Sequence, residues 1–261
     1  MALGVCTTFP NHAWEAYART CLDSFARYWP RDVRLDVYLD DPALLGSCYS
    51  VLAPRLSTSE VHVGKSPAHD VFVRRNGPGE SQTLRYAACR FSHKVAALKA
   101  TADRTTADPE SHLLWLDADV ITRMPVTHDW VGQFLPRGEQ HVSYLGRSGF
   151  PYSECGFVGY RMSVQGRSFI DAFWAMYETE ALFKLQQWHD SFVFDRVRER
   201  FDPAWFKDIA AGAPGVHVWL NTRLAERLEH WKGPVAKRQR RPIPDQESLA
   251  LVGVARAPAE S

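Results

Sequence analysis

The sequence has no long apolar run and no strong excess of charge of either sign. Its 31 lysine and arginine residues nearly balance 30 aspartate and glutamate residues, so the formal net charge is +1. No global field therefore attracts a polyanion, and we expect no nucleic-acid partner. No stretch approaches the length of a membrane span, and the residues after Met1 do not resemble a signal peptide. We expect a cytoplasmic protein, with a peripheral contact at the inner face of the membrane left open.

Cysteine is also scarce. The five cysteines are odd in number and widely spaced, and no two of them form a C-x-x-C pair. This pattern excludes a zinc-binding grouping and predicts reduced, mostly structural thiols. The 261 residues are 45% hydrophobic, which suffices to bury a full core. We expect one domain over residues 1–240, followed by a flexible tail or linker over 241–261, where Pro, Ala and charged residues are frequent.

One acidic stretch organises the rest of the chain. In LLWLDADV, residues 113–120, an apolar run ends in Asp117 and Asp119 and then resumes. The run fits a buried central strand, and alternation along a strand would point both carboxylates to the same side. A bound divalent cation is the usual way in which proteins offset such repulsion, and carboxylate oxygens are good ligands for Mg²⁺ or Mn²⁺. The alternative is a strand end at which Asp117 caps a turn and Asp119 is solvated.

The first forty residues read as a βαβ unit. We expect a strand over residues 2–6, a helix that begins near Trp14 and stops at Pro30, and a second strand over residues 33–39. Such a unit predicts a mostly parallel sheet with ligand groups at the carboxyl ends of its strands. Thr7, Thr8 and Asp40 stand at those ends. Helix capping and an ordinary turn are the alternative roles for them.

The next eighty residues contain an irregular part and a helical part. Residues 44–82 are rich in Ser, Pro, Gly and charge, and we expect irregular surface with one short strand near Val61 and a mobile loop. From Thr83 a helical pattern returns, and on it Arg90 and Lys94 lie four residues apart on one face. Beside the acidic strand they can hold a nucleotide diphosphate. A solvated basic helix edge is the alternative.

Two further acids are candidates for the site. Glu154 begins a glycine-bearing apolar stretch, in which glycines predict a close packing partner such as a sugar. Glu154 can bind sugar hydroxyls, or it can form an ion pair with Arg147 or Arg161. Asp190 precedes an apolar periodic run, in the position of an N-cap or first-turn acid. The chain between the acidic stretch and Asp190 is long enough for Asp190 to return to the metal.

A basic stretch lies near the end of the chain. His230 precedes a Gly-Pro pair and a run of cations that extends to Arg241. We expect a compact loop that faces an anion, with His230 as a metal ligand and Lys237 near phosphate. A solvated basic tail or a membrane-surface patch is the alternative.

Five stretches together resemble the metal-dependent glycosyltransferases of the GT-A fold, which carry a DXD motif, and especially small bacterial and viral enzymes that build polysaccharides. The stretches are FSHKVAAL, WLDADV, SECGF, WHDSFVFD and HWKGPVAK, from about Leu84 to Lys237. The last one also resembles the H-x-x-G-x-x-K signature of the glycogenin-like retaining family, from which it departs by one extra residue before Lys237. The resemblance implies an α/β fold in which a nucleotide-binding, Rossmann-like half is continuous with an acceptor half.

The resemblance also implies a reaction and roles for residues. The reaction moves a sugar from a nucleoside-diphosphate sugar, with UDP favoured, to a saccharide or lipid-linked glycan. Mn²⁺ or Mg²⁺ would stabilise the diphosphate leaving group and would be held by Asp117, Asp119 and His230. Asp190 is the first choice for the catalytic base and Glu154 the second, while in a retaining enzyme Asp190 would stabilise the cationic sugar. The expected donor-binding residues are Thr7, Thr8, Asp40, Arg90, Lys94, Asp117 and Lys237.

Two other functions compete with sugar transfer. A sugar-phosphate nucleotidyltransferase would use a similar fold and a carboxylate-held metal, but such enzymes usually begin with a glycine-rich basic loop, which TTFP at residues 7–10 is not. A non-catalytic carbohydrate-binding module on the same scaffold is the other alternative, and both acids and His230 argue against it. Fusion to, or assembly with, other glycan-synthesis modules stays open.

Overall fold

Seven strands form the central sheet in a computed structural model that describes residues 2–77, 85–215 and 217–242. In spatial order they are β3 (Ser59–Val63), β2 (Arg34–Leu39), β1 (Leu3–Thr8), β4 (Asp108–Leu116), β7 (Glu154–Met162), β6 (Val142–Leu145) and β8 (Phe206–Asp208). Among these strands β7 runs antiparallel to both of its neighbours, and the other pairs are parallel. The predicted mostly parallel α/β sheet is therefore confirmed.

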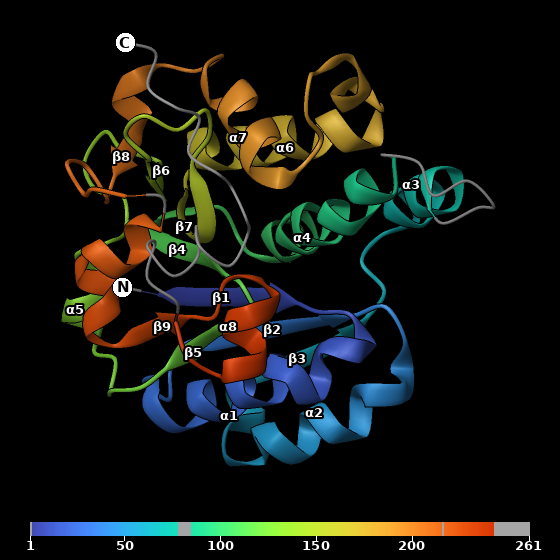
Figure 1. The fold of residues 1–261 in the computed structure, drawn as a ribbon, viewed down its shortest axis with the longest axis vertical. Coiled ribbons are helices and arrows are strands. Elements are labelled where there is room, and N and C mark those ends of the chain that lie inside the picture. Colours follow the sequence, from blue (N-terminus) through green and yellow to red (C-terminus); the bar gives the residue numbers. More distant parts are fainter. Residues whose placement is uncertain (1, 78–84, 216, 243–261) are drawn as a thin grey trace, which may run out of the picture.

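Helices cover both faces of this sheet (Figure 1). On one face, α1 (Arg19–Tyr28) and α2 (Leu45–Leu52) bury side chains such as Phe25 and Leu52 in a core with Val5. On the other face, α4 (Arg85–Arg104), α6 (Val164–Glu178) and α7 (Asp190–Arg198) pack around Trp115 and Phe169. The remaining α-helices are α3 (Pro67–Asn76), α5 (His128–Gly132) and α8 (Gly233–Gln239).

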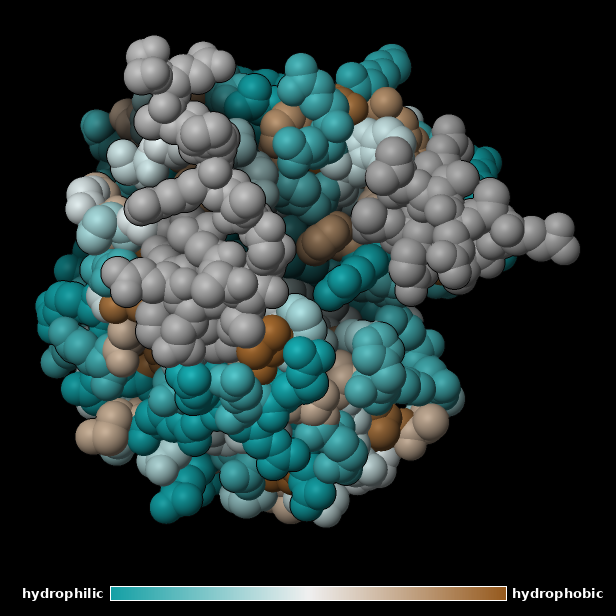
Figure 2. Space-filling model, in the orientation of Figure 1, coloured by the Kyte–Doolittle hydropathy of each residue, from teal (hydrophilic) through white to brown (hydrophobic). Residues whose placement is uncertain are grey.

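Short helical turns connect these elements. The 3₁₀ turns are η1 (Asn11–Ala13), η3 (Pro42–Leu44), η4 (Ala53–Thr58), η5 (Ala181–Lys184), η6 (Pro203–Trp205), η7 (Val218–Asn221) and η8 (Arg223–Glu226), and η2 (Trp14–Ala18) is a π-helical turn that leads into α1. No described helix is both long enough and apolar enough to cross a bilayer. On the face drawn in Figure 2, most residues that are not grey are hydrophilic, with hydrophobic residues scattered among them. All five cysteines are buried free thiols.

A second, two-stranded sheet holds the end of the described chain against its middle. β5 (Val120–Thr122) pairs antiparallel with β9 (Leu228–His230), and Val120 lies opposite His230. Strand β5 directly follows Asp117 and Asp119, so this pairing places His230 beside the two aspartates. Figure 1 shows β5, β9 and α8 together beside the end of the central sheet.

The structure corrects several predicted boundaries. β1 extends to Thr8, so Thr7 and Thr8 lie in the strand and not in the loop after it. The apolar periodic run after Asp190 forms α7, which begins at Asp190 itself. Asp190 is in the first turn, as expected, while the N-cap is His189, whose ring accepts a hydrogen bond from Phe192 N.

Two stretches that were expected to be irregular are helical. Residues 44–77 contain α2 and α3 besides the predicted strand β3, and the expected mobile loop falls partly on residues 78–84, which lie outside the described residues. Ser66 caps α3 and Pro67 occupies its first turn, where the missing N–H of proline costs nothing. The predicted loop after His230 is likewise wrong, because Gly233 and Pro234 begin α8. Of the predicted tail, residues 243–261 are not described.

Candidate active site

The acidic stretch lies where the chain passes from one sheet to the other. β4 ends at Leu116, residues 117–119 form a turn, and β5 begins at Val120. Asp117 N donates to Gly156 O over 2.9 Å, and Trp231 N donates to Asp119 O over 2.9 Å. The strand alternation expected at these residues is therefore absent, and the two carboxylates meet different partners.

Asp119 lies between His230 and Lys237. Its Oδ1 is 3.2 Å from His230 Nε2 and its Oδ2 is 2.7 Å from Lys237 Nζ. Burial alone would raise the pKa of Asp119, but its interactions with His230 and Lys237 outweigh burial and lower it. The β5–β9 pairing brings His230 to this position, and the last turn of α8 brings Lys237.

Lys94 joins the other two acids. From the middle of α4, its Nζ lies 3.0 Å from Asp117 Oδ1 and 2.8 Å from Asp190 Oδ2, and it also donates to Cys155 O. Burial would lower the pKa of Lys94, but the two carboxylates raise it above its ordinary value. Trp115 Nε1 donates to Asp117 Oδ1 over 2.6 Å and fixes that carboxylate from the strand side.

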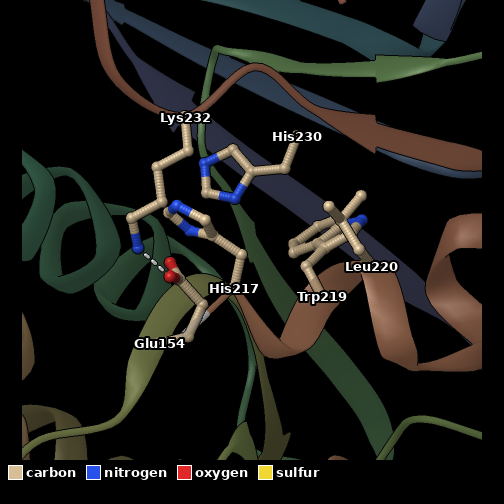
Figure 3. Close-up of a pocket in the computed structure, with 6 residues that line it drawn as sticks. All are labelled: Glu154, His217, Trp219, Leu220, His230 and Lys232. Carbon is tan, nitrogen blue, oxygen red and sulfur yellow. Dashed lines mark hydrogen bonds and ion pairs between the residues drawn. The ribbon is translucent and has the colours of Figure 1, made fainter. Parts of the chain in front are cut away.

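Glu154, the first residue of β7, is held by two cations. Arg147 Nη2 lies 2.5 Å from Glu154 Oε2, and Lys232 Nζ contacts the same oxygen (Figure 3). The other oxygen, Oε1, accepts a hydrogen bond from Gly156 N over 3.2 Å. Of the ion pairs weighed from the sequence, the one with Arg147 is present. Burial lowers the pKa of Lys232 to about 7, and the charge of Arg147 acts in the same direction.

The donor set at this centre suits a hard or borderline divalent cation. Asp117, Glu154 and His230 each offer one ligand atom, and the three atoms lie within 4.8 Å of one another. The buried Oδ1 of Asp119 accepts no hydrogen bond within the described chain and faces His230. Carboxylate oxygens with one imidazole nitrogen fit Mn²⁺ well and Mg²⁺ acceptably.

Gly156 makes room for this centre. A Cβ at this position would lie 2.9 Å from His230 Cε1 and 3.4 Å from Asp117 Oδ2. The glycines of this stretch were expected to admit a close ligand such as a sugar. At Gly156 the close neighbour is instead the imidazole of His230, because the strand passes directly beneath the histidine.

Four predicted residues lie apart from these ion pairs. Thr8 Oγ1 donates to Tyr38 O over 2.8 Å, and the buried Thr7 Oγ1 has no hydrogen-bond partner in the described part of the chain. Asp40 pairs with Lys65 and with His93, the residue before Lys94 on α4. Arg90 is exposed one turn before Lys94.

Sequence reasoning missed Tyr17 and Trp219. Lys237 Nζ lies 4.4 Å from the centre of the Tyr17 ring. Burial and the charge of Asp119 raise the pKa of Tyr17 to about 12, with Arg90 acting in the opposite direction. The Trp219 ring lies 5.0 Å from that of His230 and walls the pocket drawn in Figure 3. Both looked like ordinary core aromatics in sequence, and no local pattern separates them from core residues.

Comparison with known proteins gives a likeness in structure only. No family model matches the sequence, and no curated protein is significantly similar to it. Among solved structures, mouse xyloside xylosyltransferase 1 in its apo form superposes with a TM-score of 0.55 at 12% identity, over 94% of this chain and 100% of that one. The chain has the fold of a glycosyltransferase. GlyE of Streptococcus pneumoniae TIGR4 is also similar, with a TM-score of 0.50 and 14% identity over 80% of this chain and 45% of GlyE.

Proposed function

We propose that this protein is a metal-dependent glycosyltransferase that moves a sugar from a nucleoside-diphosphate sugar, preferably a UDP-sugar, to a saccharide or lipid-linked glycan. The observation that carries the proposal is the meeting of Asp117, Glu154 and His230 within 4.8 Å in a chain of glycosyltransferase fold. Residues 1–240 act as one domain in this proposal.

The metal would be held by Asp117 and His230 of this group together with Asp119, whose Oδ1 lies 3.2 Å from His230 Nε2, while Glu154 stays bound to Arg147 and Lys232. When bound, Mn²⁺ or Mg²⁺ supplies positive charge where the diphosphate leaving group becomes negative. Lys237 lies against Asp119 and Lys94 against Asp117, so a diphosphate at this metal would also meet both ammonium groups. The Lys94 and Lys237 side chains are only 12% and 20% exposed, which would strengthen their attraction for the developing charge.

Asp190 is better placed than Glu154 to act on the reacting sugar. Both oxygens of Glu154 are engaged, one by Arg147 and Lys232 and the other by Gly156 N. One oxygen of Asp190, Oδ2, is paired with Lys94 over 2.8 Å. A carboxylate at this position would serve as the base of an inverting enzyme, and in a retaining enzyme it would stabilise the cationic sugar.

Nucleotide binding with and without metal tests the proposal. Isothermal titration of the metal-free protein with UDP, GDP and UTP should show tight binding of a nucleoside diphosphate only after Mn²⁺ or Mg²⁺ is added. A preference for the triphosphate would favour the nucleotidyltransferase. Metal-independent saccharide binding with no nucleotide affinity would favour the carbohydrate-binding module, and either result would overturn the proposal.

A further inference from the structure

A second and wider pocket opens on the far side of the loop that carries Arg147. It is bounded by the loop over residues 146–153, by residues 195–199 at the end of α7 and by residues 208–212 from the end of β8, and its cavity volume is about 400 Å³. That size falls in the range of small-molecule sites. Its residues are separate from the small pocket beside His230.

Hydrogen bonds hold both ends of the loop over residues 146–153, which forms one wall of this pocket. At one end Asp208 Oδ1 accepts from Gly146 N over 2.8 Å. At the other end the buried Asp195 accepts from Ser153 N over 2.6 Å and from Ser153 Oγ over 2.8 Å. The tip between these ties holds Phe150, which is 39% exposed. The loop that lines the pocket is therefore held in place at both ends, and it presents an exposed aromatic ring at the rim of the pocket.

The lining suits a neutral polyol. Three arginines face three carboxylates, so charge balances, and Arg198 pairs with Asp195 over 2.9 Å. An anionic ligand would meet as much repulsion as attraction, and a purely apolar ligand would desolvate these charged groups. Sugar hydroxyls, in contrast, donate to carboxylates and accept from guanidinium groups. The rings of Phe150 and Tyr152 offer the apolar surface on which the C–H face of a sugar ring can lie.

The pocket also reaches the candidate active site through two side chains. Arg147 lines the pocket and binds Glu154 at the centre. The Tyr152 ring lies 4.4 Å from that of His189, which caps α7 immediately before Asp190. We propose that this pocket binds the acceptor, a neutral oligosaccharide whose chain extends away from Asp190 and stacks on Phe150. The assignment rests on the proposed glycosyl transfer.

The test compares two exposed aromatic residues. Phe150→Ala removes the stacking ring, and the control Tyr49→Ala removes a ring of equal exposure (40%) on α2, outside the pocket. The probes are neutral di- and trisaccharides of xylose, glucose and galactose, used with Mn²⁺ and a UDP-sugar. Phe150→Ala should lower kcat/KM for the acceptor about ten-fold through a higher KM, as expected for a lost aromatic contact, while donor hydrolysis stays within about two-fold. Tyr49→Ala should behave as wild type.

Three results would overturn the acceptor assignment. They are unchanged acceptor KM in Phe150→Ala, an equal fall in transfer and donor hydrolysis, or tighter binding of glucuronate-containing than of neutral oligosaccharides. Saturation-transfer NMR with the same saccharides, without nucleotide, keeps the test independent of catalysis. Saccharide contacts that Phe150→Ala abolishes would support the pocket even if metal-dependent UDP binding failed, so the two proposals can fail separately.

Discussion

The ammonium of Lys94 is shared by two acids of the candidate site, Asp117 and Asp190. Its side chain is only 12% exposed. Without it, two carboxylates would face each other in a poorly solvated position. Lys94 therefore contributes to the fold as well as to the candidate site.

Lys94→Met should lower the free energy of unfolding by about 3–5 kcal/mol, because it leaves buried charge uncompensated. Urea denaturation measures the change. The control is Lys99→Met, on the same helix, where the pair with Asp103 is exposed and worth less than about 1 kcal/mol. Equal losses in the two variants would mean that Lys94 makes no special contribution.

Asp119 and His230 carry the metal hypothesis. Asp119→Ala and His230→Ala should each abolish metal-dependent UDP binding in calorimetry, while the near-UV circular dichroism stays that of the folded protein. The control His128→Ala removes a histidine that also pairs with an aspartate, Asp32, but on the exposed surface. A variant at either site residue that binds UDP with normal metal dependence would remove that residue from the ligand set.

Replacing Asp190 should affect the rate of the reaction and not the affinity for the donor. Asp190→Asn keeps the shape of the side chain and loses its charge, so turnover should fall by about 10²-fold or more while the donor dissociation constant changes little. Steady-state rates at saturating donor and acceptor measure this. Glu154→Gln is the comparison, because Glu154 is already occupied by Arg147 and Lys232 and should affect acceptor KM more than turnover. Near-normal turnover of Asp190→Asn would exclude it from the reaction.

The sequence placed the acids and His230 near one another for a physical reason. Polar residues at strand ends gather at one edge of a parallel sheet, and Asp117, just after β4, follows that rule, whereas the antiparallel β5–β9 pairing brings His230 there. Arg147 lies only seven residues before Glu154, but Lys232 reaches Glu154 through long-range packing. Local spacing alone therefore left several partners for Glu154 open.

Strand β7 contains Gly156, which has no room for a side chain because His230 packs against it. Gly156→Ala would bring its Cβ to 2.9 Å from His230 Cε1 and displace the imidazole. We expect metal-dependent UDP binding to weaken at least about ten-fold, as for loss of a correctly placed ligand. The control is Gly4→Ala on β1, where the nearest atom would be 3.6 Å away. Unchanged metal-dependent affinity in Gly156→Ala would contradict a ligand role for His230.

Elements with strong periodicity were predictable, and short helices in polar sequence were not. The βαβ unit and α4 follow from regular apolar spacing. α2 and α3 lie in a stretch rich in Ser, Pro and charge, where composition suggests a loop and the start signal of Ser66 and Pro67 is purely local. The Gly-Pro pair at the start of α8 led to a wrong prediction of a loop for the same reason, since proline is as compatible with the first turn of a helix as with a β-turn.

Across the whole molecule, several buried groups make the fold sensitive to acid. Burial lowers the pKa of His69 to about 3, so His69 is neutral in the fold and charged in the unfolded chain below its ordinary value near 6.5. Asp40 is partly buried, which acts to raise its pKa, but His93 and Lys65 outweigh burial and lower it. The partners of Asp119 likewise lower its pKa. Each lowered pKa means that the folded state binds fewer protons than the unfolded state, and stability is lost as pH falls.

Thermal unfolding from pH 8 to pH 3 should therefore show two stages. The melting temperature should begin to fall below about pH 6.5, where unfolded His69 takes up a proton, and should fall more steeply below about pH 4, where the aspartates do. His69→Gln should reduce the first stage and leave the second, because burial also lowers the pKa of His112, His141 and His189. A melting temperature independent of pH over this range would contradict the assignment.

The β5–β9 pairing also sets an order of events during synthesis. Val120 and His230 lie opposite each other in the sheet, yet more than a hundred residues of chain are made between them. A ribosome releases the aspartates well before β9, so the emerging chain carries Asp119 without His230 or Lys237. The last strand to arrive closes both the small sheet and the candidate metal centre. Under the proposed function, a nascent polypeptide therefore could not bind the donor until translation had passed α8.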